Sequence, residues 1–371
     1  MNVSTFSNIP VLNVNEIINK LSRSYSKLIK DNISIKSFPS VMLWGAPGVG
    51  KSQAIKQIAK EITNQTGKQT KVTDVRLLLF NPIDLRGIPT VNQERTLSKW
   101  LKPQIFDMDE SSDIINILFL DEISSAPPSV QAAAYQITLD RVIGEHKLPD
   151  NCIVIAAGNR LNDQSVVYKM PKALANRLLH FEVENDFLSW KEWAIKNNIN
   201  EKVVGFLSFK SNYLIDELSK SENLAYATPR SWEMVSNVLN NISDDIDEVE
   251  SLISGLIGVG TTIEFKTWCN VYKDLPNIQD IFEGKPVKIP SSTDTIYALI
   301  SSMVRYAKNY KDDLFKIGNS IKYACDLPAD FSLILIQDYM CLEKNYKHKL
   351  LTLPEFNRWY NTKGRILNVI I

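Results

Sequence analysis

Residues 45–52 read GAPGVGKS and combine three glycines with a lysine and a serine. Glycine permits backbone angles that a β-carbon forbids, so successive N–H groups of such a loop can converge on one anion. Lys51 could then reach the β and γ phosphates of a nucleotide, and Ser52 could hold a magnesium ion. The spacing predicts a phosphate-binding loop in which all eight residues contribute to the site: Gly45, Ala46, Pro47, Gly48, Val49, Gly50, Lys51 and Ser52.

A second group of candidate residues ends the apolar run ILFLDE at 117–122. A phosphate-binding loop needs an acidic partner on a neighbouring strand, because magnesium must be held opposite Ser52 and a water must be oriented for attack. Asp121 would complete the magnesium shell, and Glu122 would polarise the water. The alternative is an ordinary buried strand that ends in a charged loop; the nearby glycine motif favours the catalytic interpretation.

The run CIVIAAGNR at 152–160 also ends in polar residues. Asn159 could lie between the terminal phosphate and the attacking water. The alternative is that Asn159 is an ordinary turn residue, since Asn is common in turns after strands. Without its sequence context, this alternative would be favoured.

Five apolar runs could form the strands that carry these residues: 41–44, 75–80, 115–120, 152–157 and 178–183. Helical or loop segments separate them, an alternation typical of a parallel sheet with helices on both faces. After the glycine loop, apolar residues recur at helical spacing, namely Ala54, Ile55, Ile58, Ala59 and Ile62. Strand, loop and helix thus fall in the order that a phosphate-binding loop requires, which argues against a chance glycine turn.

After about residue 186 the pattern changes to amphipathic helical segments such as FLSWKEWAIKNN and TPRSWEMVSNVL. A stretch rich in Pro and polar residues at 274–292 indicates a linker into a last helical part. The sequence therefore predicts an N-terminal helical segment (1–37), an α/β core (38–186), a helical domain (187–270) and a helical C-terminal extension (271–371). The spacing of Trp190 and Trp193 favours packing on one helix face over stacking with nucleic acid, since no basic cluster interleaves with them.

Composition narrows the classes of function. Lys plus Arg and Asp plus Glu both total 42 among 371 residues, so no global positive field attracts nucleic acid or an anionic membrane. No apolar run approaches 18 residues and the N-terminus lacks the pattern of a signal peptide, so we expect a cytoplasmic protein. The four cysteines and three histidines are isolated, which argues against disulfides and zinc.

The motifs together resemble those of the MoxR-type AAA+ ATPases over residues 38–265. The resemblance is carried by GAPGVGKS, FNPIDLRGIPTV at 80–91, ILFLDEISSAPPSVQAAAYQITLDRVIG at 117–144, AAGNR, ALANRLLHF at 173–181 and ATPRSWE at 227–233. It implies an AAA+ P-loop core with a five-stranded parallel sheet, followed by a helical lid domain. It also implies a homo-oligomeric ring, usually a hexamer, with ATP and Mg²⁺ bound between subunits.

The resemblance also assigns roles to individual residues. Asn159 looks like sensor 1, Arg177 like the arginine finger donated to the neighbouring subunit, and Arg230 like sensor 2 on the lid. Arginine suits both roles because its guanidinium group stays charged and its planar N–H groups can donate two hydrogen bonds to phosphate oxygens. A structural salt bridge is the alternative for Arg177 and for Arg230, and Arg160 is a second candidate for the finger.

Two stretches fall where this family carries inserts facing a central pore: 84–100, DLRGIPTVNQERTLSKW, and 139–151, LDRVIGEHKLPDN. The two inserts could bind a substrate or partner. For the individual residues Leu85, Ile88, Val142 and Leu148, packing against the core is favoured over direct contact with a partner.

The resemblance implies remodelling or chaperone-like activation of a protein partner, in this family one with a von Willebrand factor A domain. A nucleic-acid-dependent ATPase, such as a helicase or clamp loader, is the alternative that the balanced charge disfavours. A third possibility is an ATP-gated assembly switch with negligible turnover. This possibility gives no role to Glu122, Asn159 and Arg177.

Overall fold

The structure is a computed structural model that describes residues 9–160, 168, 170–216 and 223–364. The chain divides into two compact units, residues 1–186 and residues 187–371. The ends of the predicted N-terminal segment and C-terminal extension, 1–8 and 365–371, lie outside the described residues.

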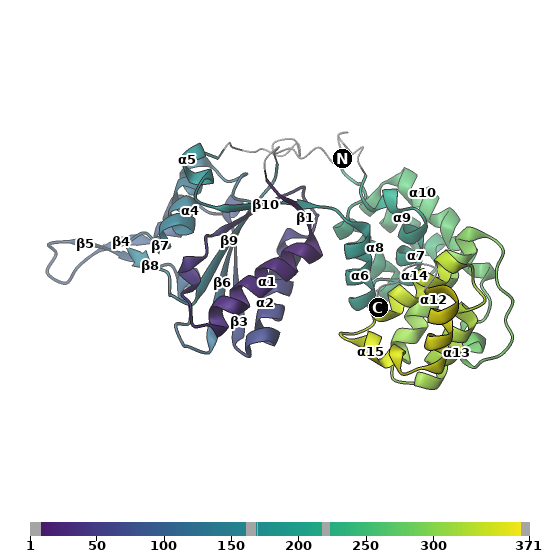
Figure 1. The fold of residues 1–371 in the computed structure, drawn as a ribbon. Helices are drawn as coiled ribbons and strands as arrows, with labels where there is room; N and C mark the ends of the chain where they lie inside the picture. The colour runs from purple at the N-terminus through teal and green to yellow at the C-terminus, as the bar shows by residue number, and fades with distance from the viewer. Residues whose placement is uncertain (1–8, 161–167, 169, 217–222, 365–371) are drawn as a thin grey trace. The chain divides into compact units, whose positions relative to one another are not determined.

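Unit 1 is built on a six-stranded sheet in which every pairing is parallel (Figure 1). In spatial order the strands are β1 (Val11–Asn13), β10 (Leu179–Glu184), β2 (Val41–Trp44), β9 (Cys152–Gly158), β6 (Ile114–Asp121) and β3 (Gln69–Arg76). The expected α/β core is confirmed, with one strand more than the five predicted. The additional strand is β1, which pairs with β10 at the edge of the sheet.

The strand expected at 75–80 is wrong in its position. The strand β3 occupies Gln69–Arg76, where polar and apolar residues are mixed, and the apolar run that follows forms the 3₁₀ helix Leu77–Leu79. Leu77 is fully buried, whereas Leu79 is 75% exposed. An edge strand of a parallel sheet needs less apolar content than a central one, so the apolar run misled the prediction.

Helices cover both faces of the sheet. Val41 and Leu43 of β2 pack into the core cluster shared with α1 (Val14–Lys30) and α2 (Lys51–Thr66), which lie side by side (Figure 1). Met42 and Trp44 point to the opposite face, where α4 (Pro128–Asp140) contributes to the core. The shorter elements of unit 1 are η1 (Ile35–Ser37), α3 (Pro82–Arg86), β4 (Ile88–Val91), β5 (Ser98–Leu101), η3 (Gln104–Phe106), β7 (Val142–Ile143), β8 (His146–Lys147) and α5 (Lys172–Ala175).

The described residues of unit 2 form helices joined by loops and contain no strand (Figure 1). Its α-helices are α6 (Phe187–Lys196), α7 (Glu201–Phe209), α8 (Pro229–Asn241), α9 (Ile246–Ile257), α10 (Val259–Cys269), α11 (Ile278–Phe282), α12 (Thr293–Asn309), α13 (Leu314–Ala324), α14 (Ala329–Met340), α15 (Tyr346–Leu351) and α16 (Pro354–Trp359). Single turns lie at Ser211–Leu214, Asn270–Asp274 and Tyr360–Gly364. No helix within the described ranges combines the length and the apolar character that crossing a membrane requires.

The two tryptophans of α6 pack as expected. Trp190 is 7% exposed within an apolar cluster, and Trp193 is partly buried against the same cluster. The packing interpretation of this pair is therefore confirmed.

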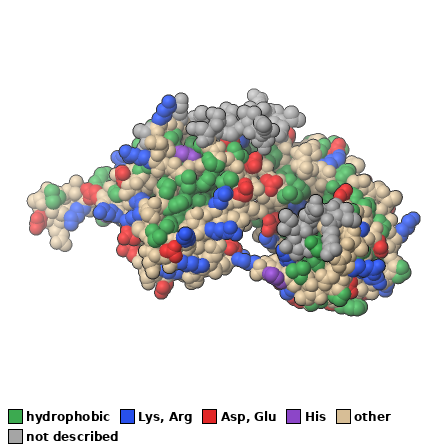
Figure 2. Space-filling model, viewed as in Figure 1, with side chains coloured by type: hydrophobic (Ala, Val, Ile, Leu, Met, Phe, Trp, Pro, Cys, Tyr) green, Lys and Arg blue, Asp and Glu red, His purple; other side chains and the backbone are tan. Residues whose placement is uncertain are grey.

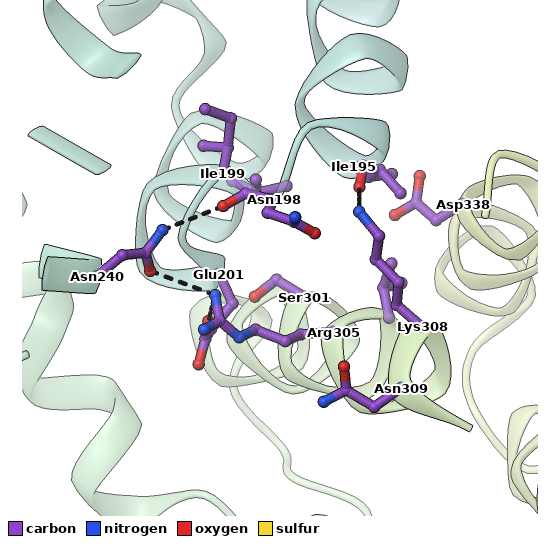
Figure 3. Close-up of a pocket in the computed structure, with 12 residues that line it drawn as sticks. Ile195, Asn198, Ile199, Glu201, Asn240, Ser301, Arg305, Lys308, Asn309 and Asp338 are labelled. Carbon is purple, nitrogen blue, oxygen red and sulfur yellow. Dashed lines mark hydrogen bonds and ion pairs between the residues drawn. The ribbon is translucent and has the colours of Figure 1, made fainter. Parts of the chain in front are cut away.

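Charged hydrogen bonds tie α12 to the first helices of unit 2, around a cavity of about 350 Å³ (Figure 3). Lys308 donates to the carbonyls of Ile195 and Lys196 at 2.6 and 3.0 Å, which satisfies the carboxyl end of α6. Arg305 pairs with Glu201 of α7 at 2.9 Å. The predicted boundary near residue 270 thus falls inside a single compact unit.

Candidate functional site

The glycine motif forms a loop between β2 and α2. Gly50, directly before α2, has φ +100°, a left-handed conformation that a side chain would strain. A β-carbon on Gly45 would lie 2.9 Å from the carbonyl oxygen of Val183 in β10. The glycines therefore allow both the turn into the helix and the close approach of this loop to the neighbouring strand.

Lys51 lies at the first position of α2 and is 8% exposed. Its ammonium group donates to the carbonyls of Gly45 and Ala46 at 2.6 and 3.0 Å, and to the side-chain oxygen of Asn159 at 3.3 Å. A buried ammonium group needs hydrogen-bond acceptors such as these, because burial without them costs free energy. The arrangement holds a positive charge where the loop meets the end of β9.

Ser52 and Asp121 also meet, as their assignment to one magnesium site requires. The Ser52 hydroxyl donates to Asp121 Oδ2 at 2.9 Å, which joins the start of α2 to the end of β6. A hydroxyl and a carboxylate are hard oxygen donors of the kind that Mg²⁺ takes, usually with phosphate oxygens and waters completing the shell. The two residues therefore fit the ion.

Glu122 follows the strand in a left-handed conformation with φ +59°. A non-glycine residue held in this region costs about 1–3 kcal/mol, and such residues cluster at functional sites. Two backbone hydrogen bonds hold it: Glu122 N–H donates to Asp121 Oδ1 at 2.9 Å, and Ile123 N–H donates to the carbonyl of Ala157 at 2.9 Å. The turn fixes the glutamate beside the aspartate.

Ser124 is a site residue that the sequence did not indicate. Its hydroxyl accepts the backbone N–H of Asn159 at 2.8 Å, and its carbonyl accepts the side-chain amide of Gln131 at 3.2 Å. The side chain is 2% exposed. Ser124 thereby joins the acidic turn after β6 to the asparagine turn after β9. Only knowledge that these strands pair could have found it, because a serine after an acidic pair has no distinctive pattern.

The two finger candidates differ in their surroundings. Arg160 forms an ion pair with Glu182 of β10 at 2.8 Å, and these side chains are 26% and 4% exposed. Arg177 is exposed in the turn between α5 and β10, and no described residue forms an ion pair with it. Arg160 is thus paired with a buried carboxylate of this chain, whereas Arg177 is exposed.

Arg230 is the second residue of α8, which begins after the Thr228 cap. The helix belongs to unit 2 and the glycine loop to unit 1. The arginine side chain is exposed, and its assignment as sensor 2 stays a prediction.

Both predicted inserts contain β-hairpins, β4–β5 and β7–β8. His146 donates from Nε2 to the carbonyl of Trp100 at 2.9 Å, which ties the second hairpin to the first. Packing against the core is confirmed for Leu85 and Leu148, at 1% and 3% exposed, but is wrong for Ile88, at 62%.

The long hairpin β4–β5 exposes several apolar side chains. Val91, Leu97 and Leu101 are exposed beside Ile88, and charged side chains lie among them along the projection in Figure 2. Isolated exposed apolar residues are normal, but a group on one projecting element indicates a contact surface.

Residues 40–180 match the model of the "ATPase family associated with various cellular activities (AAA)". A curated relative, the chaperone MoxR1 of Mycobacterium tuberculosis, is 26% identical over 151 residues, which cover 40% of this chain and 36% of the relative. The chain thus matches about a third of that relative's length.

Two solved structures are also similar. A putative ATPase from Cytophaga hutchinsonii is 18% identical, with 64% of this chain and 66% of that chain covered and a TM-score of 0.33. RuvB of Thermotoga maritima is 15% identical, with 79% and 83% covered and a TM-score of 0.35. Global similarity at this level says nothing about function.

Proposed function

We propose that the protein is a MoxR-type AAA+ ATPase that hydrolyses Mg-ATP in a homo-oligomeric ring, most simply a hexamer. The match of residues 40–180 to the AAA family model and the similarity to a MoxR chaperone support this proposal. The energy would remodel or activate a protein partner in the cytoplasm. The MoxR resemblance points to a partner with a von Willebrand factor A domain.

The observation that carries this proposal is the convergence of two pairs of residues on the glycine loop. Lys51 meets Asn159 at 3.3 Å, and Ser52 meets Asp121 at 2.9 Å. Each pair joins the start of α2 to a different central strand. The four residues therefore lie at one edge of the sheet, which supports a site that combines a phosphate-binding loop, a magnesium ligand and a water-positioning amide, as phosphoryl transfer requires.

Each residue then has a specific task. Lys51 would exchange its carbonyl acceptors for phosphate oxygens, and Ser52 and Asp121 would hold magnesium, which would supply positive charge to the β and γ phosphates. Glu122 accepts a hydrogen bond from the attacking water and so orients it, and Asn159 holds that water against the terminal phosphate.

We assign the trans-acting arginine to Arg177. The ion pair with Glu182 already occupies Arg160, and breaking it would leave a carboxylate that is 4% exposed without that partner. Arg177 has no such cost. Its guanidinium would stabilise charge that develops on the phosphate bound by the adjacent subunit.

Mixing two inactive variants tests this function. Glu122→Gln should lower ATP hydrolysis about 10²-fold or more, and Arg177→Ala about 10³-fold, while both still bind ATP. In mixed assemblies, an Arg177→Ala subunit with an intact Glu122 can receive Arg177 from a Glu122→Gln neighbour. Measurable hydrolysis should therefore reappear on mixing. If subunit exchange is confirmed and no activity returns, Arg177 does not act in trans and Arg160 becomes the better candidate for the finger.

A further inference from the structure

His180 of β10 forms hydrogen bonds with two segments of the chain, one directly before the phosphate-binding loop and one directly before Arg177. Its Nδ1 lies 3.0 Å from the indole nitrogen of Trp44, and its Nε2 lies 2.7 Å from the carbonyl oxygen of Ala175. The indole and imidazole planes are 17° from parallel and their centroids lie 6.2 Å apart, as expected for two rings joined edge to edge by this hydrogen bond. These contacts fix both the position and the rotation of the imidazole.

The chemistry of the partners assigns one role to each ring nitrogen. An indole N–H can only donate and a backbone carbonyl can only accept. Nδ1 is therefore the unprotonated nitrogen, and Nε2 carries the proton that it donates to Ala175. Neither bond can form with the ring turned over, so the pair specifies a single arrangement.

The two hydrogen bonds of His180 connect segments that carry proposed site residues. Trp44 directly precedes Gly45, the first residue of the phosphate-binding loop, and Ala175 lies two residues before Arg177. Between them, Glu182 of β10 is the register partner of Trp44 and holds Arg160, next to Asn159. His180 and Glu182 lie on one face of β10, because side chains two apart on a strand share a face.

We propose that Trp44 and His180 form a positioning relay that holds the turn carrying Arg177 in place against the phosphate-binding loop, so that Arg177 reaches the nucleotide of the neighbouring subunit. The proposal rests on the proposed function, in which Arg177 acts in trans. Both residues are positioning residues, since they act through Arg177.

The relay can be tested in the subunit that donates Arg177 and in the subunit that uses it. Trp44→Phe keeps an aromatic ring in the core and removes the indole N–H that donates to His180. We call the Glu122→Gln subunit, which supplies Arg177, the donor subunit. In the donor subunit, Trp44→Phe should lower the ATP hydrolysis restored by mixing by about 10-fold or more, because a displacement of a catalytic group by about 1 Å can lower the rate about 10²-fold. Added instead to the Arg177→Ala partner, it should leave that activity within about twofold.

Two further variants control for packing. Trp193→Phe in the donor removes an indole N–H that donates to no described residue, and it should have no effect. His180→Leu in the donor should act like Trp44→Phe, whereas His180→Gln, which retains a donor and an acceptor, should recover most of the activity. ATP affinity of every donor, measured by titration, should stay within about twofold of the parent, which excludes damage to the loop itself.

The outcomes separate the relay from the function on which it rests. If the parental mixture shows no activity, trans action and the relay are both overturned. If the parental mixture is active and Trp44→Phe costs nothing in the donor, the relay alone is overturned. A loss confined to the Arg177→Ala partner also overturns it, since Trp44 would then support the loop of its own subunit. A loss confined to the donor, with recovery by His180→Gln, supports it.

Discussion

The ammonium group of Lys51 lies 3.3 Å from the side-chain oxygen of Asn159, although 108 residues separate them in the chain. The contact joins the loop after β2 to the turn after β9, and these two strands are neighbours in the sheet. Because all strands run parallel, residues that follow different strands meet at one edge. The site is thus a consequence of sheet order, and its parts can be tested individually.

Lys51→Ala should abolish ATP binding or weaken it at least about 100-fold, because in the proposed site the lysine would supply the charge that faces the β and γ phosphates. The measurement is a nucleotide titration of the purified variant. Lys60→Ala is the matched control, since Lys60 is exposed on the same helix and should bind ATP normally. Unchanged affinity in Lys51→Ala would contradict the assignment of the loop.

Ser124→Ala should lower kcat about 5- to 10-fold with little change in ATP affinity. The hydroxyl accepts the backbone N–H of Asn159, and loss of one such bond is worth about 1 kcal/mol. Ser125→Ala is the control, because its hydroxyl is buried but bonds to no described residue. Equal effects of the two substitutions would mean that Ser124 does not position Asn159.

Local patterns in the sequence predicted the parts of the fold that local interactions determine. The glycine loop, the apolar central strands and the helix from Lys51 each carry their own signal, and four of the five predicted strands lie within a residue or two of those observed. β1 has only three residues and forms because β10 offers an edge, which no local pattern records. The apolar run at 75–80 predicted a strand, but the strand ends at Arg76 and Leu77–Leu79 form a 3₁₀ helix, because a short apolar run does not by itself specify the type of secondary structure.

The same distinction applies to the site. Lys51, Ser52, Asp121 and Glu122 belong to contiguous motifs, so the roles proposed for them follow from residue types and spacing alone. Ser124 and His180 bond to residues 35 and 136 positions away, and their roles exist only once the strands are paired. Long-range hydrogen bonds of this kind require the tertiary structure.

Replacing 93–96 with a two-residue Asn-Gly turn should preserve folding and basal ATP hydrolysis but abolish stimulation by a protein partner. Within this tip the Asn92 side chain accepts the backbone N–H groups of Thr96 and Leu97, so the loop is held by its own contacts and not by the core. Asn-Gly suits a tight hairpin turn. The measurements are thermal unfolding and ATPase rates with and without the partner. If the partner still stimulates ATP hydrolysis after the replacement, the hairpin tip is not part of the contact surface.

In unit 2, Lys191 and Asp338 form an ion pair at 2.7 Å in which each side chain is 9% exposed. Burial raises the pKa of Asp338, and the charge of Lys191 opposes that shift. Removal of one partner leaves a buried charge without compensation, so Lys191→Met should destabilise unit 2 by about 3–5 kcal/mol near neutral pH. Urea unfolding measures this loss.

The pH dependence of this variant distinguishes a buried charge from lost packing. Without Lys191 the pKa of Asp338 in the folded state rises further above its unfolded value of 3.8. A folded-state pKa above the unfolded one means that stability falls as pH rises between the two values, so the loss in Lys191→Met should shrink as the pH is lowered through that range. The double variant Lys191→Met/Asp338→Leu removes both charges and should lie within about 1 kcal/mol of the wild type at every pH tested, since well-packed apolar residues can replace a buried pair. A loss in Lys191→Met that does not change with pH, and that persists in the double variant, would show that the lysine stem contributes packing and that the ion pair contributes little.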